Sequence, residues 1–213
     1  MIKVSENTEK KELIIAASER LFSLEDFDAV SVRDIAKEAG ANLAMISYYF
    51  GSKENLYREI ILRRIDSNQT ILKEIVAKKI SNWDKIELII DLYVEKMLNN
   101  REFQRIMNRE MSVDTRPHLR QLIMDRIKLN REMMMVLVEE GVRKKEFRKE
   151  IDIEMLLLNF FASMQHLTGS SYFSCQMFNK NTDQELYTPA FNLRIKKHFK
   201  NLFKNSLLIK QSV

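Results

Sequence analysis

Apolar residues recur every three to four positions along most of the chain, which is the spacing of one buried face on an α-helix. From Lys53 onward this spacing continues for more than twenty residues and predicts a long connecting helix. The pattern predicts nine helices in all: 8–22, 32–39, 43–50, the long helix from 53, 83–98, 102–111, 117 to about 142, 152–168 and 193–208. Residues 170–189 have weak periodicity and receive no assignment.

Capping residues set the boundaries of the short helices near the N-terminus. Ser31 precedes the second apolar stripe and Asp34 follows three residues later, which is the spacing of a capping box. Gly40 ends that helix, and Asn42 is a good N-cap for the next. Ser52 then caps the long helix. Three helices therefore fit within the first fifty residues.

The composition supports an all-α fold. Hydrophobic residues make up 45% of the 213 residues and charged residues 31%, which excludes a disordered or low-complexity chain. Four glycines and two prolines are too few for the turns of a many-stranded sandwich or barrel. We expect an N-terminal three-helix module over residues 1–57, joined by the long helix to a C-terminal helical bundle over residues 58–213 that dimerises.

The second and third predicted helices are joined by Ala39, Gly40 and Ala41, which matches a helix-turn-helix. At 100 degrees per residue, Ile46 and Phe50 share one face of the third helix, and we expect that face to be buried. The remaining side chains are then available to a DNA major groove, with these on the outer face or its flanks: Ala44, Met45, Ser47, Tyr48 and Tyr49. Three packed helices without a nucleic-acid role would have the same spacing.

The charge distribution gives DNA binding only limited support. The net charge is +5, yet residues 1–57 hold seven Lys or Arg against ten Asp or Glu. Residues 31–64 are mildly positive, with six basic residues against four acidic ones. The N-termini of helices at Ser31, Asn42 and Ser52 can present backbone amides to phosphates, so the acidic balance does not exclude binding.

The residues of this region resemble a known family. Val32-Arg33-Asp34-Ile35-Ala36-Lys37-Glu38-Ala39-Gly40 and Ile46-Ser47-Tyr48-Tyr49-Phe50-Gly51-Ser52-Lys53-Glu54-Asn55-Leu56 are similar to the signature of the tetracycline-repressor (TetR) family of transcription regulators. The resemblance covers about residues 8–57. It departs from the family at residues 25–28, which lack a common glycine, and at Ser47, where a tyrosine is usual. Base preference therefore does not transfer.

The resemblance implies a two-fold dimer that binds a palindromic operator in double-stranded DNA, and a C-terminal domain that binds a small-molecule effector. It makes residues 43–49 the recognition helix and Lys53 a phosphate contact. The candidate DNA-binding residues are Ser31, Arg33, Asn42, Leu43, Ala44, Met45, Ser47, Tyr48, Tyr49 and Lys53. We expect a repressor that its ligand releases from the operator.

No sequence pattern supports catalysis, a cofactor or a metal. His118, His166 and His198 lie far apart without metal-ligand spacing, and Cys175 has no activating partner nearby. One cysteine cannot form an internal disulfide, and the polar residues 1–11 do not resemble a signal peptide. The longest apolar run, 133–138, is too short to span a membrane. We expect a cytoplasmic protein that is not an enzyme and has no membrane partner.

The bundle carries candidates for an effector pocket and a dimer interface. Thioethers fit irregular shapes, so methionines can line an adaptable pocket, although ordinary core packing explains each one equally well. The predicted pocket residues are Tyr93, Met97, Phe103, Met107, Met111, Phe161, Met164 and Gln165. The predicted dimer contacts, from helices 152–168 and 193–208, are Met155, Leu158, Phe199, Leu202 and Phe203.

The last helix leaves an alternative open. Residues 191–213 contain six Lys or Arg and no acid, beside an apolar face. Such a helix suits a dimer interface with a solvated rim, or an interaction module that binds an anionic surface or a protein partner. Sequence-specific binding to duplex DNA separates the two functions.

Overall fold

The computed structural model describes the backbone of residues 2–209 and the side chains of residues 8–209, and every regular element in that part is a helix. The helices are α1 (Ile2–Leu24), α2 (Val32–Ala39), α3 (Leu43–Phe50), α4 (Lys53–Val76), α5 (Asn82–Asn99), α6 (Arg101–Ser112), α7 (Pro117–Arg143), α8 (Ile153–Gly169), α9 (Ser171–Met177), α10 (Asp183–Leu186) and α11 (Pro189–Leu207). The all-α prediction is confirmed. The unassigned stretch contains the two short helices α9 and α10.

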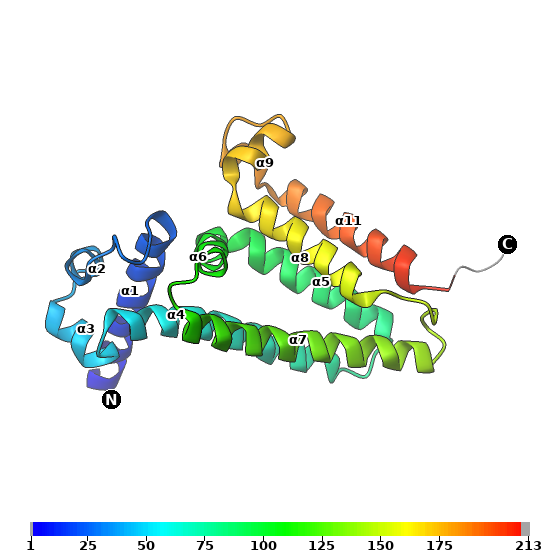
Figure 1. Cartoon of the computed structure of the whole chain (residues 1–213), viewed down its shortest axis with the longest axis horizontal. Coiled ribbons are helices and arrows are strands. Elements are labelled where there is room, and N and C mark those ends of the chain that lie inside the picture. The colour runs from blue at the N-terminus through cyan, green and yellow to red at the C-terminus, as the bar shows by residue number, and fades with distance from the viewer. Residues whose placement is uncertain (1, 210–213) are drawn as a thin grey trace.

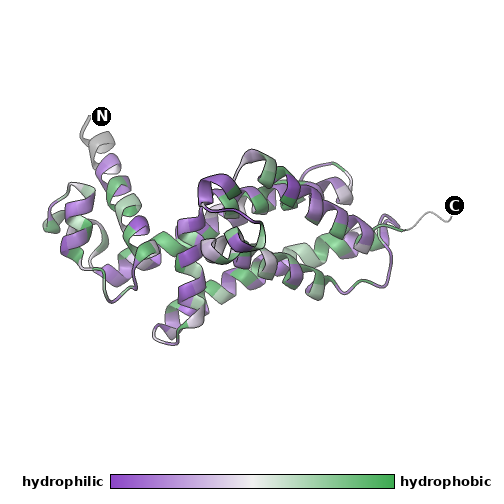
Figure 2. Cartoon of the chain, turned by 90° about the horizontal axis from the view of Figure 1, so that it is seen from above, coloured by the Kyte–Doolittle hydropathy of each residue, from purple (hydrophilic) through white to green (hydrophobic). Residues whose placement is uncertain are grey.

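The chain forms a small N-terminal module and an elongated bundle (Figure 1). Helices α1 to α3 lie at one end, and α4 runs from them along α7 into the bundle. Helices α5, α8 and α11 pack beside one another in the bundle, and α6 lies between α1 and α8. Figure 2, seen from above, shows the module standing apart at one end. No helix within residues 2–209 is long and apolar enough to cross a membrane.

Two hydrophobic clusters hold these parts together. The N-terminal cluster joins α1, α2 and α3 to the first half of α4, and it also takes in Phe103 and Ile106 of α6 with Leu119 and Ile123 of α7. The second cluster fills the bundle around α5, α8 and α11. The N-terminal core thus includes residues beyond residue 57. The division of the chain into two domains at that residue remains a prediction.

The apolar face of α11 packs inside the bundle. Its five buried residues are Phe191, Ile195, Phe199, Phe203 and Leu207. A membrane-surface helix needs its apolar face free to enter the lipid. The fold therefore weakens the alternative in which this helix binds an anionic membrane, because its apolar face is already covered.

Candidate DNA-binding surface and effector cavity

The helix-turn-helix begins at a complete capping box on α2. The hydroxyl of Ser31 accepts a hydrogen bond from the backbone N–H of Asp34 at 3.1 Å, and the Asp34 carboxylate accepts one from the backbone N–H of Ser31 at 3.0 Å. The Ser31 hydroxyl also donates to the Asp34 carboxylate, and this bond together with the one from the Ser31 backbone N–H holds the pKa of Asp34 below its usual value. At the other end, Gly40 adopts φ +59, a left-handed conformation that glycine reaches without strain, and α2 stops there.

Helix α3 follows two residues later with its own cap. The side-chain oxygen of Asn42 accepts a hydrogen bond from the backbone N–H of Met45 at 2.9 Å. Ile46 and Phe50 are buried, as predicted from the helical spacing. Because Ser31 and Asn42 use their side-chain oxygens as caps, what they can offer DNA is mainly the adjacent backbone amides.

The outer face of α3 is open to solvent. Tyr48 is 77% exposed and Leu43 is 43% exposed, and Ala44 and Ser47 are also exposed. Met45 is only half-buried and packs against the N-terminal cluster, so its assignment to the outer face was wrong in part. Tyr49 also packs against that cluster. The side chains of α3 that remain candidates for contacts in a DNA groove are the four exposed ones: Leu43, Ala44, Ser47 and Tyr48.

The two helices that contact α3, α2 and α4, carry cations in different settings. Arg33 and Lys37 on α2 and Arg58 on α4 are exposed and form no ion pair within residues 8–209. Lys53 is different, since its ammonium donates to the carbonyl oxygens of Phe27 and Val30, both at 2.9 Å. A lysine has three N–H donors, so one remains for the predicted phosphate contact. That contact remains a prediction, and sequence reasoning missed the structural role of Lys53.

The comparisons with known proteins agree with this geometry. Residues 14–60 match the family model described as bacterial regulatory proteins, tetR family. The chain is 26% identical over 184 residues to the "Probable HTH-type transcriptional regulator YttP" of Bacillus subtilis (strain 168), covering 85% of this chain and 86% of that protein. The chain belongs to the TetR family of transcription regulators.

Solved structures share the fold of this TetR-family regulator. The ketosteroid transcriptional regulator KstR2 of Mycobacterium tuberculosis superposes with a TM-score of 0.74 at 16% identity, covering 94% of this chain and 95% of that one. FadR of Bacillus subtilis in complex with stearoyl-CoA superposes with a TM-score of 0.67 at 18% identity, covering 88% of this chain and 96% of that one. The family is not enzymatic, and the regulator binds DNA through its helix-turn-helix.

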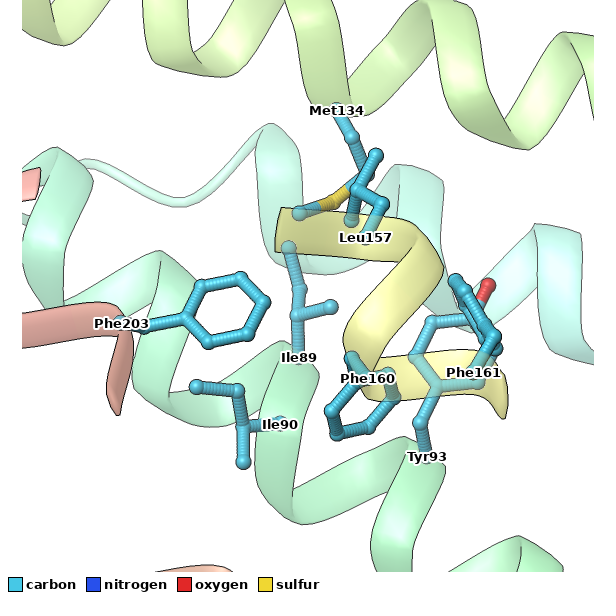
Figure 3. Close-up of a pocket in the computed structure, with 8 residues that line it drawn as sticks. All are labelled: Ile89, Ile90, Tyr93, Met134, Leu157, Phe160, Phe161 and Phe203. Atoms are coloured by element: carbon cyan, nitrogen blue, oxygen red, sulfur yellow. The ribbon is translucent and has the colours of Figure 1, made fainter. Parts of the chain in front are cut away.

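The TetR-family regulator has an apolar cavity of about 20 Å³ in its bundle (Figure 3). Its lining comes from four helices: Ile89, Ile90 and Tyr93 on α5, Met134 on α7, Leu157, Phe160 and Phe161 on α8, and Phe203 on α11. Tyr93 and Phe161 meet edge to face, with ring centroids 5.3 Å apart. Burial raises the pKa of Tyr93 to about 12, so its hydroxyl is neutral at physiological pH.

Two of the predicted pocket residues of the regulator, Tyr93 and Phe161, line this cavity. Met97 and Met164 belong to the same bundle cluster without lining the cavity, and Gln165 is exposed. The other three pack in or against the N-terminal cluster: Phe103, Met107 and Met111. Grouping those three with Tyr93 was wrong, because α6 turns its apolar face toward the module. The other residues that line the cavity, on α5, α7, α8 and α11, were not predicted from the sequence. They have the same helical spacing as any core residue, so the sequence does not distinguish them.

Of the predicted dimer contacts of the regulator, some are buried inside the subunit and others are exposed. Phe199 and Phe203 are each 2% exposed and pack edge to face against Phe160, with ring centroids 4.6 and 5.9 Å apart. Their assignment to the dimer interface was wrong, because they fill the core of their own subunit. Leu202 packs half-buried against that core. Met155 and Leu158 are 50% and 59% exposed and remain available to a partner.

The residues with possible metal or redox chemistry do not form a site. Within residues 8–209 no group of three His, Cys, Asp or Glu side chains could hold a metal ion. Cys175 is buried, and desolvation together with nearby Asp183 raises the pKa of its thiol. A raised pKa disfavours the thiolate, so Cys175 is not an activated nucleophile.

Proposed function

We propose that this TetR-family regulator is a dimeric repressor that an apolar small molecule releases from a two-fold operator. The main support for this proposal is the apolar cavity between α5, α7, α8 and α11. The predicted recognition helix α3 is exposed and lies outside these four helices, in the N-terminal module. An effector can shift operator affinity only if it binds the two states of the protein differently. Helix α8 lines the cavity and contacts α6, which in turn contacts α1 of the DNA-binding module.

The size of the cavity indicates how an effector would act. At about 20 Å³ the cavity holds no drug-sized molecule, whereas ligand sites measure roughly 300 to 1,000 Å³. Binding must therefore separate α5 from α8, and the rearranged bundle is the state that the effector stabilises. The closed bundle is then the state that binds the operator.

The lining indicates the chemistry of the effector. Seven of the eight lining side chains are hydrocarbon or thioether, and the Tyr93 hydroxyl is the single polar group among them. Burying a charge against such a surface is costly, so the buried part of the ligand is an uncharged hydrocarbon. The relatives named for stearoyl-CoA and ketosteroids support an acyl or sterol-like skeleton.

The dimer is expected to centre on α8. Met155, Leu158 and Phe161 leave apolar surface exposed along this helix. The outer face of α11 instead exposes Arg194, Lys197 and Lys204. Like charges repel when a two-fold axis brings them together, so the axis is expected nearer α8 than α11.

The test begins with selection of duplexes from a random pool by the full chain. The selected duplex is then titrated with the protein in the presence of stearoyl-CoA, free stearate or a 3-ketosteroid. The proposal expects a palindromic duplex and at least one probe that weakens its binding by about five- to 150-fold. Enrichment without any palindrome, or binding that no apolar probe changes, would contradict it.

A matched pair of variants tests the cavity itself. Ile89→Phe adds volume at the cavity, whereas Leu88→Phe adds a similar side chain at a position of α5 that is 38% exposed. Overpacking should weaken binding of the active probe only in Ile89→Phe. Equal probe affinity in the two variants would locate the effector elsewhere.

A further inference from the structure

Arg109 of α6 binds the connection between α1 and α2. Its Nη1 donates to the carbonyl oxygen of Phe22 at 2.8 Å and to that of Glu25, and its Nε lies 2.8 Å from the carboxylate of Asp26. The last carbonyls of a helix lack intrahelical partners and carry partial negative charge, so a guanidinium there satisfies both. One side chain of the bundle thus holds the end of α1 and the residues that lead to α2.

The neighbouring residue fixes α6 to the module in a different way. Glu110 is 1% exposed, and its carboxylate lies 2.8 Å from the guanidinium of Arg116 and 3.1 Å from the hydroxyl of Tyr57 on α4. Arg116 in turn lies over the ring of Phe27 in the α1–α2 connection, 4.6 Å from its centroid. The Glu110 carboxylate is shielded from solvent, so water cannot readily replace its partners, and we expect this ion pair to persist when the bundle changes.

The opposite face of α6 meets α8 closely. The side-chain amide of Asn108 lies 3.5 Å from the carbonyl oxygen of Gln165. A Cβ on Gly169 at the end of α8 would come within 2.0 Å of that same amide nitrogen, so the two helices have little space between them there. Helix α8 also lines the cavity and lies beside α6 (Figure 1), so we expect a movement of α8 to displace α6.

We propose that Arg109 is a positioning residue that makes the α1–α2 connection follow α6, and thereby couples the state of the bundle to the placement of Ser31 and α2 on DNA. The proposal rests on the proposed function, since it names the contact through which the cavity acts. Hydrogen bonds weaken steeply with misalignment, so a small rotation of α6 is enough to release the carbonyls. The Arg109 side chain is 29% exposed, so water replaces its lost bonds at little cost, unlike those of Glu110.

The test measures amide hydrogen exchange in full-length protein with and without the selected duplex. Coupling is reciprocal, so DNA bound to the module must stabilise the bundle contacts that favour DNA binding. In wild type the duplex should slow exchange in α6 by at least about fivefold. In Arg109→Ala the duplex should still bind, because the module core does not include Arg109, but exchange in α6 should change less than twofold.

Two further variants make the result specific. Arg120 also binds a backbone carbonyl and an acid, Val113 and Asp114, but both lie in the α6–α7 connection, so Arg120→Ala should keep the wild-type slowing. Arg109→Lys keeps the positive charge but lacks the planar set of N–H donors of a guanidinium, so the duplex should slow exchange in α6 by an amount between those for wild type and Arg109→Ala. If Arg109→Ala does not fold, Arg109→Lys is measured in its place.

The outcomes separate this proposal from the proposed function. If the duplex slows amide exchange in α6 as much in both Arg109 variants as in wild type, the coupling role is overturned and the repressor proposal is left intact. Absence of slowing in wild type that binds the duplex would also overturn the role. Failure of the wild type to select any duplex would overturn both. A purely structural Arg109 would lower thermal stability without changing how exchange in α6 responds to DNA.

Discussion

The ammonium nitrogen of Lys53 lies 2.9 Å from the carbonyl oxygen of Val30, the residue that precedes the Ser31 cap of α2. It also lies 4.3 Å from the ring centroid of Phe27, whose carbonyl it binds as well. The first residue of α4 therefore fixes the start of α2. This side chain therefore holds together the N-termini of α2 and α4, at Ser31 and Ser52, which are two of the three helix ends that we expect to approach phosphates.

Lys53→Ala should lower both stability and DNA affinity. Loss of two hydrogen bonds from a charged donor is expected to reduce the free energy of unfolding by about 1 to 3 kcal/mol, measured by urea denaturation. If the third donor reaches a phosphate, binding to every duplex weakens alike and the salt slope falls by about 1 per subunit. Lys37→Ala, an exposed cation of α2, serves as the control for stability and should change it by less than about 0.5 kcal/mol. Wild-type stability in Lys53→Ala would refute the structural role.

Substitutions on the exposed face of α3 should change base preference. Ala44 can make apolar contacts to thymine methyl groups, and the Ser47 hydroxyl can bond a base edge. Changes at these positions are expected to shift preference by about 1 to 3 kcal/mol at an affected base pair, measured with point-mutated operators across a salt series. Arg58→Ala, which removes an exposed cation of α4 and changes no side chain of α3, serves as the control and should lower affinity alike for all sequences. An Ala44 and Ser47 double variant with unchanged preferences would exclude α3 as the reading helix.

The dimer and the subunit core should respond to different residues. Leu158→Glu places a charge on the exposed face of α8 and should yield monomers in sedimentation without lowering subunit stability. Phe203→Ala removes a ring from the bundle core and should cost about 3 to 5 kcal/mol of stability. A Leu158→Glu protein that sediments as a dimer would move the interface away from this part of α8.

Alkaline pH should destabilise the bundle through Tyr93. Its pKa is raised to about 12 by burial, compared with about 10 in the unfolded chain. Between about pH 10 and 12 the unfolded chain therefore loses a proton that the folded protein retains, and the free energy of unfolding falls by about 1 to 3 kcal/mol. In denaturant titrations the free energy of unfolding of Tyr93→Phe should fall less over this pH range than that of wild type. Tyr48 is 77% exposed, so the free energy of unfolding of Tyr48→Phe should follow that of wild type. Identical curves for Tyr93→Phe and wild type would contradict this assignment.

The sequence determined the local features of this protein. Caps at Ser31 and Asn42 and the break at Gly40 depend on residues within a few positions of one another, so spacing alone predicts the helix-turn-helix. The buried face of α3, with Ile46 and Phe50, follows from the same short-range periodicity. The family signature lies in these residues, which is why fold and DNA binding were predictable.

Only the tertiary structure decided which apolar faces meet. Phe203 and Leu158 both follow helical spacing, yet one fills the core and the other lies 59% exposed, because burial depends on which helix packs alongside. Phe103 and Tyr93 likewise belong to different clusters, because α6 faces the module while α5 faces the bundle. Arg109 reaches the Phe22 carbonyl of α1 from more than eighty residues away in the chain, a contact without any periodic pattern to predict it.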